Sequence, residues 1–523
     1  MSDGLRRDPA GAAGQRYDLV VIGGGITGAC LLLEAARRGL RPLLLEQADY
    51  GHATSGNSLR ILHGGLRYLQ TLDLPRLRAS VAERRWFSRG FPELVRPLPC
   101  LMPLYGPGLR RPAPMRAALA LNDALSAGRN RGVAPSVRLP PGRVLSPAET
   151  LRVFPGARRA GLLGGALWHD VAMTSSERVM IEILRWAVAA GATALNYTRA
   201  VGLRATRGAV TGVEAVDLET GGELVFEAPV AVACAGPWAR EVAGMLDGPI
   251  AVLPPLALAF NLLLDRPPVA PVAVAVTPDG GGRTYFVVPW KGRVLAGTEH
   301  LPWHGDGPAV PGPARIRGML EALASAVPAL GDVGPGDVVR VLAGLMPTDA
   351  PGGAEPSSRD RVVDHGLEGG VRGLYSVVGV KYTTARSLAE RVLRRTGAGA
   401  GTGTERDGVH GPAVDRPQPV AAVRSERAVI GSAAWADIVG NEAVLHLDDL
   451  LLRRMEWPSD APPAQDALAD LARRRGWDAE RRAQELERLR TAVAVATPSG
   501  TPTDAMSAPA PGAVSESAPG GGS

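Results

Sequence analysis

Residues 17–46 read YDLVVIGGGITGACLLLEAARRGLRPLLLE and decide the fold of this chain. The stretch holds two short apolar runs, each typical of a strand that is buried on both faces, with a helical pattern between them. Three glycines follow the first run, and Gly39 can end the helix in a left-handed turn. We therefore predict a strand–helix–strand unit made of strand Leu19–Ile22, turn Gly23–Gly25, helix Ala29–Arg38 and strand Pro42–Leu45.

The glycines of this turn have the spacing G-x-G-x-x-G, which is typical of a dinucleotide site. Gly23 permits the tight turn, Gly25 lets the backbone approach a pyrophosphate, and Gly28 lets the helix pack closely on the strand. The helix N-terminus offers free N–H groups and its positive dipole end to phosphates. Glu46 stands where a carboxylate can accept hydrogen bonds from a ribose. The predicted dinucleotide contacts are Gly23, Gly25, Ile26, Thr27, Gly28, Glu46 and Gln47.

A second stretch, DYGHATSGNSLRILHGGLRYLQ at residues 49–70, is rich in small and hydroxylic residues. Its hydroxyl groups can bond a second phosphate or the hydroxyls of a ribitol chain. Two adjacent glycines would let the backbone approach a flat ring such as isoalloxazine. The alternative is a glycine-rich surface loop. The predicted contacts with a bound cofactor here are Thr54, Ser55, Ser58, His63, Gly64 and Gly65.

The opening fingerprint followed by TSGNSLRILHGGLRYL at 54–69 resembles the FAD-dependent glycerol-3-phosphate dehydrogenase family, flavoproteins that share the fold of D-amino-acid oxidase and sarcosine oxidase. HGGLRYL is its most specific part. The resemblance extends over residues 17–395, through LVRPLP at 94–99, AGPW at 235–238, FVVPWKGRVLAGT at 286–298 and GVKYTT at 379–384. It implies an α/β fold with a discontinuous Rossmann-like FAD-binding domain, an antiparallel-sheet substrate domain and a C-terminal helical domain.

The predicted division of the chain follows from this resemblance and from the composition of the linkers. Residues 129–143 are basic and rich in proline and glycine, so an exposed loop is expected there. The expected parts are a mobile lead at 1–15, the FAD-binding domain at 16–95, 160–250 and 350–396, the substrate domain at 96–159 and 251–349, a linker at 397–419, a helical domain at 420–496 and a disordered tail at 497–523.

The resemblance implies that FAD is held by two further backbone turns. One lies at Ala235-Gly236, where a buried strand ends. The other, at 379–384, is a second glycine turn that opens a helix and can point its N-terminus at the N1–O2 edge of a reduced flavin. The predicted contacts of these turns are Ala235, Gly236, Gly379, Lys381, Tyr382 and Thr383.

FAD accepts a hydride at N5, so the protein must hold the flavin, present a carbon-bound hydrogen and remove a hydroxyl proton. A substrate phosphate is bound best by guanidinium groups, and Arg67 and Arg359 match the arginines of the family pattern. Tyr68 can hydrogen-bond a substrate oxygen, and Lys381 can stabilise negative charge. His63 is a candidate proton acceptor or a residue that packs against the flavin, and the sequence assigns no general base.

Two departures from the family pattern fall in the substrate domain. The family has Gly-x-Arg-Pro where this chain has Gly344-Leu345-Met346-Pro347, and Met346 cannot bond a phosphate. Losing one charge-assisted hydrogen bond costs about 1.5–3 kcal/mol, roughly ten- to a hundredfold in affinity. The second departure is Glu299-His300, where the family has Thr and Asp.

The composition of the chain indicates which binding partners and which cellular location to expect. The chain has 523 residues, a net charge of +6 and 45% hydrophobic residues, typical of globular protein. The excess of arginine suits a phosphorylated substrate or an anionic membrane surface, but no arginine run alternates with aromatic residues, so nucleic-acid binding is not expected. The three cysteines show no metal spacing, and neither an export signal nor a spanning segment is seen. We expect a cytoplasmic protein, peripheral on the inner face of the cytoplasmic membrane if it contacts one; a homodimer is compatible with the sequence.

The sequence thus predicts an FAD-dependent dehydrogenase that oxidises a secondary alcohol, most simply sn-glycerol 3-phosphate to dihydroxyacetone phosphate. As in the family, electrons would pass to a quinone or to oxygen. Two rivals stay open: an FAD oxidoreductase that acts on a different hydroxy or amino compound, and a flavin-binding protein without catalysis. An NAD-dependent dehydrogenase would leave the second half of the flavin site unexplained.

Overall fold

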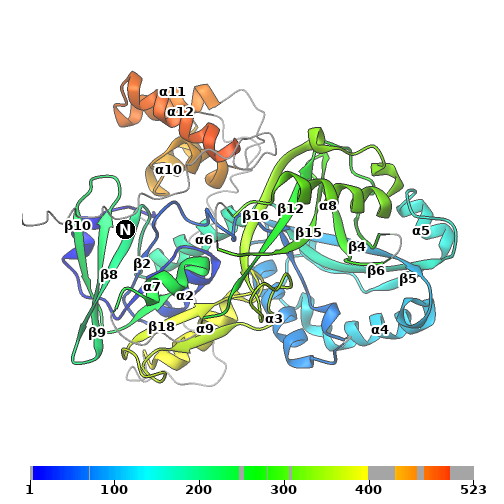
Figure 1. Ribbon diagram of the computed structural model, residues 1–523, viewed down its shortest axis with the longest axis horizontal. Helices are drawn as coiled ribbons and strands as arrows, with labels where there is room; N and C mark the ends of the chain where they lie inside the picture. Colours follow the sequence, from blue (N-terminus) through cyan, green and yellow to red (C-terminus); the bar gives the residue numbers. More distant parts are fainter. Residues whose placement is uncertain are drawn as a thin grey trace, which may run out of the picture.

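The computed structural model describes residues 4–69, 71–246, 253–278, 281–305, 309–398, 430, 432–455 and 464–494. Two sheets dominate the view in Figure 1, with the sheet that contains β2 and β18 toward the left and the larger sheet of β4, β6 and β12–β16 toward the right. Helices α10–α12 lie above the left-hand part, over β2 and α2. The mixed α/β architecture is the one that the sequence predicts.

The six-stranded sheet is built around the strand–helix–strand unit. Its order is β17-β18-β11-β1-β2-β7, and every neighbouring pair is parallel except β17–β18. The central strands are buried along their whole length, as parallel strands covered on both faces must be. The strands are β1 (Leu19–Ile22), β2 (Pro42–Leu45), β7 (Thr193–Leu195), β11 (Ala231–Ala233), β17 (Arg361–Asp364) and β18 (Leu374–Val378).

Helix α2 (Ile26–Ala36) is the central helix of this part, because α6 and α9 both pack against it. All its residues except Thr27 are buried, so an apolar sequence such as ACLLLEAA suits the position. Gly39 then adopts the left-handed conformation that was predicted, with φ of +79°. The flanking helices are α6 (Ser176–Ala189), which Ser175 caps, α7 (Ala239–Ala243) and α9 (Ala385–Thr396).

The larger sheet has nine strands in the order β16-β12-β15-β14-β13-β4-β6-β3, with β5 beside β6. It is antiparallel except for the β4–β13 pair. Helix α8 (Pro313–Ala326) packs on one face over a core of branched side chains such as Val274 and Leu262. The strands are β3 (Ile61–Leu62), β4 (Val95–Tyr105), β5 (Arg143–Leu145), β6 (Leu162–Met173), β12 (Leu256–Leu264), β13 (Ala273–Val276), β14 (Tyr285–Trp290), β15 (Arg293–Pro302) and β16 (Val338–Pro347).

One expected boundary differs from the structure. Residues 160–250 were assigned to the FAD-binding part, but β6 pairs with β4 from Leu162 to Met173 inside the large sheet. The reason is geometric, since the long apolar strand β4 needs a partner and the adjacent β6 has matching length. The rest of that range returns to the six-stranded sheet through β7 and β11, and also forms a three-stranded sheet of β8 (Thr198–Thr206), β9 (Ala209–Asp217) and β10 (Glu223–Glu227).

The segment 129–143 is not the exposed loop that its composition indicated. Val133, Val137 and Leu139 are buried, and the segment ends in β5. These three apolar side chains belong to the same core cluster as Phe87 of α3 (Leu74–Gly90), and helix α4 (Pro112–Leu125) precedes the segment. The neighbouring helix α5 (Pro147–Val153) begins with a capping box between Ser146 and Glu149.

The expected mobile lead is packed against the body of the protein. Helix α1 (Pro9–Ala13) follows Asp8, whose side chain accepts from the Gly11 N–H, and Leu5 is only 1% exposed. Arg7 forms an ion pair with Asp217 and donates to the Asn196 carbonyl at 2.9 Å. The expectation of mobility was therefore wrong for the described residues 4–15, because two side chains anchor a segment whose composition looked featureless.

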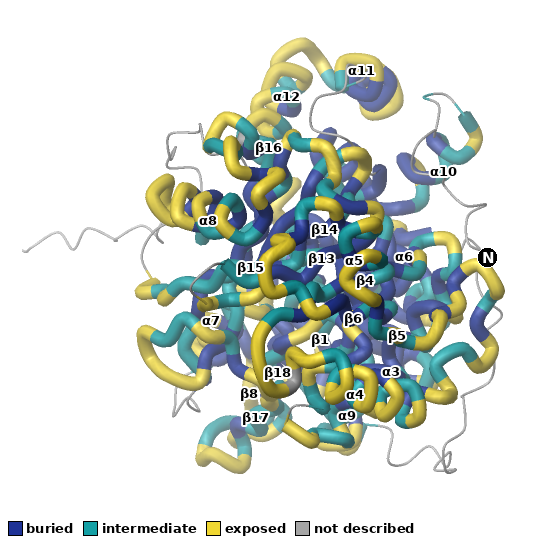
Figure 2. The backbone as a smooth tube through the Cα atoms, turned by 90° about the vertical axis from the view of Figure 1, so that its right-hand side faces the viewer, coloured by how far each residue is buried: buried dark blue, intermediate teal, exposed yellow. Residues whose placement is uncertain are grey.

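The C-terminal helices form a small unit with its own apolar core around Trp435 and Leu471. It comprises α10 (Ala433–Asn441), the single π-helical turn Asp449–Arg454, α11 (Ala464–Arg475) and α12 (Ala479–Ala494). Figure 2 shows α11 and α12 at the edge of the molecule, with exposed outer surfaces. Most of the predicted linker 397–419 and the predicted tail 497–523 lie outside the described residues.

Asp49 joins this helical unit to the nucleotide-binding part. Its buried carboxylate accepts from Arg453 Nε at 2.6 Å and from Arg454 Nη2 at 2.8 Å, and Asn196 donates to it at 3.0 Å. Burial alone would raise the pKa of Asp49, but the two guanidinium groups hold it well below its ordinary value. The segment that follows β2 is thus held in place by residues close to the end of the chain.

Candidate active site

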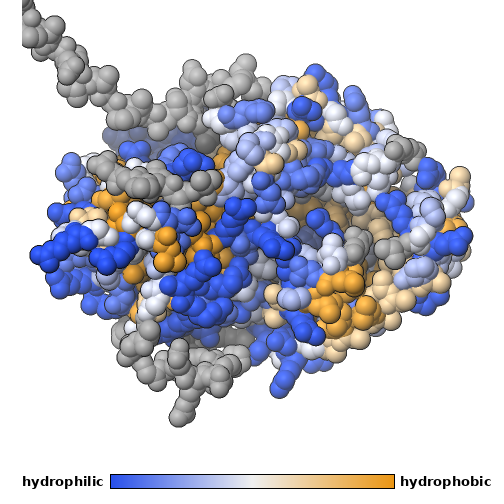
Figure 3. Space-filling view, turned by 60° about the horizontal axis from the view of Figure 1, so that its bottom comes forward, coloured by the Kyte–Doolittle hydropathy of each residue, from blue (hydrophilic) through white to orange (hydrophobic). Residues whose placement is uncertain are grey.

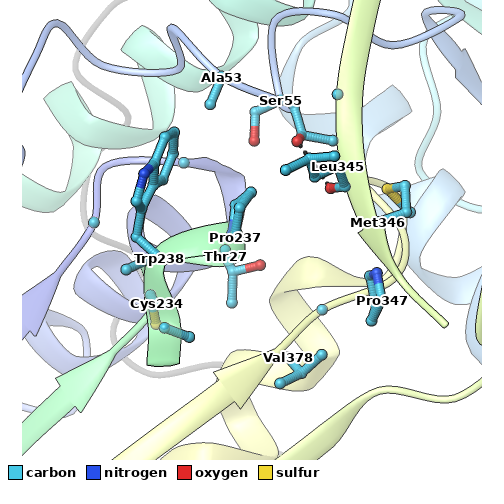
Figure 4. Close-up of a pocket in the computed structure, with 18 of the residues that line it drawn as sticks. Thr27, Ala53, Ser55, Cys234, Pro237, Trp238, Leu345, Met346, Pro347 and Val378 are labelled. Atoms are coloured by element: carbon cyan, nitrogen blue, oxygen red, sulfur yellow. Dashed lines mark hydrogen bonds between the residues drawn. The ribbon is translucent and has the colours of Figure 1, made fainter. Parts of the chain in front are cut away.

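Both predicted glycine turns line one cavity of about 720 Å³ between the two large sheets. The first turn stands at the end of β1 and the second, at 379–383, at the end of β18. The turns approach each other directly, since a Cβ on Gly379 would lie 2.9 Å from Thr27 Oγ1. Ligands of open α/β sheets bind at this place, outside the carboxyl ends of the strands. Figure 4 shows Thr27 and Trp238 on one side of the cavity and Leu345–Pro347 of β16 on the other.

The glycines of the first turn have the close contacts that the motif predicts. Gly23 has φ of +111°, and a Cβ on it would lie 2.6 Å from the Cys234 carbonyl oxygen. A Cβ on Gly28 would lie 2.0 Å from the Gly23 carbonyl oxygen. Gly28 does not line the cavity, so its part is to bring α2 against β1 rather than to contact a ligand.

The sequence predicts that the helix N-terminus and the Glu46 carboxylate are free to bind a ligand. In the structure both are hydrogen-bonded to the protein. The Ile26 N–H at the start of α2 donates to Ser55 Oγ at 3.0 Å. The Glu46 carboxylate lines the cavity, but it accepts from the Gly24 N–H at 2.6 Å and from the Ala48 N–H at 2.8 Å. Each carboxylate oxygen has two lone pairs, so Glu46 retains acceptor capacity for a ribose while it fixes the turn.

The hydroxyl groups of the second stretch are also engaged by the protein. Thr54 Oγ1 donates to the Leu345 carbonyl at 3.1 Å, which joins this loop to β16. Ser58 Oγ accepts from the Arg60 N–H at 3.2 Å. Arg60 in turn forms a bidentate ion pair with Glu177, at 2.7 and 2.9 Å, beside the cavity. These contacts hold the loop in one conformation along the cavity wall.

His63 and Asp170 form a pair at the cavity. Asp170 is buried and accepts from the Gly64 N–H at 2.7 Å, from Arg84 Nη1 at 2.7 Å and from His63 Nδ1 at 3.3 Å. Burial alone would raise the pKa of Asp170, but hydrogen bonding and charge from His63 and Arg84 hold it well below its ordinary value. His63 lines the cavity with its side chain 46% exposed. Sequence reasoning missed Asp170, whose signal was a lone acid in the apolar strand LLGGALWHD.

The predicted cationic residues divide into two groups. Lys381 lines the cavity, and its ammonium contacts the Tyr68 hydroxyl and lies 4.3 Å from the centre of the Tyr68 ring. Arg67 and Arg359 are exposed and are not part of the cavity wall. The predicted set therefore comes together around His63 and Lys381, with Tyr68 reaching the site through Lys381.

Most of the predicted cofactor contacts line the cavity. They are Gly23, Gly25, Ile26, Thr27, Glu46, Gln47, Thr54, Ser55, Ser58, His63, Ala235, Gly236, Gly379, Lys381, Tyr382 and Thr383. Gly64 and Gly65 lie behind the wall, where a Cβ on Gly64 would lie 2.0 Å from Arg84 Nη1. Gly64 thus leaves room for Arg84 to reach Asp170, whereas a Cβ on Gly65 would lie 2.8 Å from the Tyr68 ring.

The wall formed by the large sheet was not predicted residue by residue. Asn261 of β12 accepts from Thr298 Oγ1 at 2.7 Å and donates to the Asn57 carbonyl at 3.2 Å. His300, Leu345 and Met346 also line this wall. Asparagine, threonine and histidine in strands carry no recognisable spacing, so the departures at Glu299-His300 and Met346 were the local signal of this wall.

A bound dinucleotide fits these residues. Gly23 and Gly379, each with a Cβ position less than 3 Å from a neighbouring atom, face one cavity, and Ala235-Gly236 lines the same end, with Gly236 at φ of +54°. Within the described residues no group of three or more His, Cys, Asp or Glu side chains could hold a metal ion. The same part of the chain contains no helix that is long and apolar enough to cross a membrane.

The chain belongs to the FAD-dependent oxidoreductase family. The family described as "FAD dependent oxidoreductase" matches residues 18–395, which spans both glycine turns and the large sheet. FAD is therefore its cofactor, as predicted, and the predicted fold class and flavoprotein nature are confirmed.

Relatives support the resemblance to glycerol-3-phosphate dehydrogenases. A protein of Synechocystis named glycerol-3-phosphate dehydrogenase is 32% identical over 72% of this chain and 69% of its own length. Glycerol-3-phosphate dehydrogenase 1 of Mycobacterium tuberculosis is 34% identical over 73% of each. The solved glycerol-3-phosphate dehydrogenase of Bacillus halodurans, a complex with FAD, shares the fold with a TM-score of 0.70 at 21% identity, over 94% of this chain and 98% of its own.

Proposed function

We propose that this protein oxidises sn-glycerol 3-phosphate, or a closely related phosphorylated secondary alcohol, to dihydroxyacetone phosphate and passes the electrons to a quinone. The observation that carries the proposal is the meeting of both glycine turns with His63 and Lys381 at one cavity. The names of the relatives point to the same substrate. Bound FAD supplies the two-electron acceptor for the hydrogen on the alcohol carbon.

His63 is the proposed proton acceptor for the substrate hydroxyl. Asp170 is ionised across the working pH range because its pKa is low, so His63 Nδ1 donates to it. That bond leaves the lone pair on His63 Nε2. A positioned imidazole of this kind accelerates proton removal by about 10²–10⁴-fold. Asp170 acts as the positioning residue, and Arg84 with the Gly64 N–H fixes Asp170 in turn.

Lys381 is the proposed stabiliser of negative charge on the substrate oxygen or the flavin. Its contact with Tyr68 brings a phenol to the same place, which supplies a further donor. Arg67 and Arg359 are proposed only as phosphate contacts at the cavity entrance, because both are exposed. Their guanidinium groups would have to move toward the cavity for this role.

A quinone acceptor requires a membrane, and one face of the protein suits contact with it. Helix α4 exposes Ala117, Leu121 and Ala124, and Leu121 is 47% exposed. Arg111 and Arg116 border these residues and would face anionic headgroups. Figure 3 shows an apolar patch on the side of the molecule that carries α4 in Figure 1. We propose peripheral attachment through this face.

The decisive experiment is anaerobic mixing of the purified flavoprotein with sn-glycerol 3-phosphate. The proposal expects bleaching of the flavin absorbance and stoichiometric dihydroxyacetone phosphate. Reduction by an unphosphorylated alcohol or an amine instead would favour an oxidoreductase with another substrate, a second candidate that Met346 on the cavity wall supports. Bound flavin that no candidate reduces would identify a non-catalytic flavin-binding protein.

A further inference from the structure

The strand pairing around β12 places His300 and Met346 on one face of the cavity wall. Ala259 pairs with His300 of β15 on one side and with Gly344 of β16 on the other. Ala257, two residues earlier, pairs with Met346. Directly paired residues, and residues two apart on a strand, share a face, and His300 and Met346 both line the cavity.

The His300 ring is held in one protonation state by Arg283. Arg283 Nη1 lies 2.6 Å from His300 Nδ1, and a guanidinium can only donate. His300 Nδ1 is therefore the acceptor and its hydrogen is on Nε2. Burial and the charge of Arg283 lower the pKa of His300 to about 4, which agrees with a neutral ring.

Arg283 is itself fixed by two carboxylates. Glu299 lies 3.3 Å from Arg283 Nε, and Glu355 contacts Arg283 Nη2. The Tyr285 hydroxyl contacts Glu299 from β14. The guanidinium is thus held by two carboxylates, of which Glu355 also lies 3.6 Å from His300 Nδ1, and an Nη1–H orients the imidazole.

The Nε2–H of His300 is a donor without a protein partner among the described residues. The side chain is 18% exposed and stands at the cavity. A polar group at the wall of a ligand cavity, with its other ring nitrogen already bonded, is oriented to meet the ligand. The chemistry of its target follows, since an N–H needs an oxygen acceptor such as a phosphate oxygen.

We propose that His300 is a specificity-determining residue, whose Nε2–H donates to a phosphate oxygen of the substrate from β15. Met346 of β16 offers no donor on the same face, so the cavity recognises the anionic group with a neutral imidazole at this wall. Arg283 is the positioning residue that holds the hydrogen on Nε2. The inference rests on the proposed function, because it names the contact that a phosphorylated alcohol makes.

The test compares His300→Gln, which keeps a donor near the position of Nε2, with His300→Leu, which removes it. With sn-glycerol 3-phosphate and an artificial electron acceptor, we expect His300→Leu to raise KM about tenfold or more and to change kcat less than about threefold. His300→Gln should stay within about threefold of the wild-type KM. With unphosphorylated glycerol, the KM values of the Leu and Gln variants should not separate in this way.

Arg283→Leu tests the positioning role. The charged groups that face the His300 ring are Arg283, Glu355 and Glu299. Without the guanidinium, the ring can become protonated in mildly acid solution, so KM for sn-glycerol 3-phosphate should fall as pH is lowered from 8 to 6. The wild-type KM over the same range reports the titration of the substrate phosphate itself, whose second pKa is about 6. The fall must therefore appear in the ratio of the variant KM to the wild-type KM, and a purely structural effect of the substitution would not produce it.

The outcomes separate this inference from the proposed function. Equal KM values for the wild type and His300→Leu, or equal losses in the Leu and Gln variants, would overturn the role of His300. If sn-glycerol 3-phosphate fails to reduce the wild-type flavin, the proposed function fails. Calorimetric binding of inorganic phosphate to the flavoprotein then decides the inference: about tenfold weaker binding to His300→Leu supports it, and equal or absent binding overturns it.

Discussion

The two ends of the cavity are built in different ways. At the cofactor end, the close contacts belong to backbone: Gly23 meets the Cys234 carbonyl and Gly28 meets the Gly23 carbonyl. At the wall of the large sheet, the chemistry belongs to side chains, among them Asn261, His300 and Met346. Backbone contacts tolerate no replacement of glycine, whereas strand side chains can change without altering the sheet. The fold and the cofactor are therefore fixed more strictly than the substrate.

The largest effect is expected where a side chain would enter the backbone contacts of the cofactor end. Gly28→Val should abolish FAD binding, because its Cβ would lie 2.0 Å from the Gly23 carbonyl oxygen, and it should destabilise the fold by about 3 kcal/mol or more. Flavin absorbance per protein and thermal unfolding measure both effects. Gly39→Ala is the control, because it has an unfavourable φ of +79° but nothing within 4 Å. A yellow, stable Gly28→Val protein would contradict this account of the turn.

Asp170 is buried behind His63, which lines the cavity, and its substitution should be the next most severe. Asp170→Asn leaves the buried Arg84 without its charge partner, a loss of about 3–5 kcal/mol in the free energy of unfolding. It also releases His63, so anaerobic flavin reduction should slow by about a hundredfold or more. The half-buried Asp123→Asn, which loses a partner for Arg129, should cost less than about 1 kcal/mol. Wild-type reduction rates in a folded Asp170→Asn protein would refute the positioning role.

The Asp170 carboxylate should make the free energy of unfolding decrease as the solution becomes more acid. The folded-state pKa of Asp170 is depressed, so its contribution is present above the ordinary carboxyl pKa of about 4 and is lost as pH falls through the folded value. Urea unfolding between pH 2 and 6 should show a steeper acid loss for the wild type than for Asp170→Asn. Parallel curves would mean that the carboxylate contributes nothing.

An arginine introduced on the wall of the large sheet should change the binding of substrate without changing the binding of FAD. Met346→Arg should bind sn-glycerol 3-phosphate about ten- to a hundredfold more tightly, because it adds a charge-assisted hydrogen bond from β16. The FAD content should not change, since residue 346 stands on the sheet and not on the glycine turns. Met346→Leu is the matched control and should keep the wild-type KM. An unchanged KM for Met346→Arg would show that the phosphate does not approach β16.

The smallest effect is expected at the C-terminal helical unit, which is joined to the cofactor end through Asp49. His446 lies 2.8 Å from Glu485 and 3.1 Å from Glu219, and these carboxylates raise its pKa to about 9 although burial opposes this. Its stabilisation is therefore complete below about pH 6.5 and lost as pH rises through about 9, by about 1–3 kcal/mol. Thermal unfolding from pH 7 to 10 should show the loss in the wild type and not in His446→Gln. An equal slope in both proteins would exclude His446 as its origin.

Sequence reasoning reached further at the cofactor end than at the substrate wall, for a physical reason. The strands Leu19–Ile22 and Pro42–Leu45 were predicted with their observed bounds, because glycine spacing and apolar runs are local properties of the chain. The contact between His63 and Asp170 depends on β6 lying beside β3. The two residues are 107 positions apart in the chain, so no local sequence pattern indicates that they meet.

The surroundings of charged residues were the hardest feature to predict from the sequence. Arg67 and Arg359 match a family pattern, yet both are exposed, whereas Arg60, Arg84 and Arg283 are held by carboxylates beside the cavity. An arginine-rich chain gives every guanidinium the same local signal, and only the fold decides which of them meets an acid. The roles of the site residues remain predictions, as does the domain division apart from the start of the range 160–250.

The ion pair at Asp49 has a consequence for how the molecule folds. Asp49 and Arg454, which completes the ion pair, lie 405 residues apart in the chain. Contacts between residues so far apart form slowly, because the chain loses loop-closure entropy before the contact stabilises it. The loop beside the cofactor therefore gains its final support only when the C-terminal helices have docked on the six-stranded sheet.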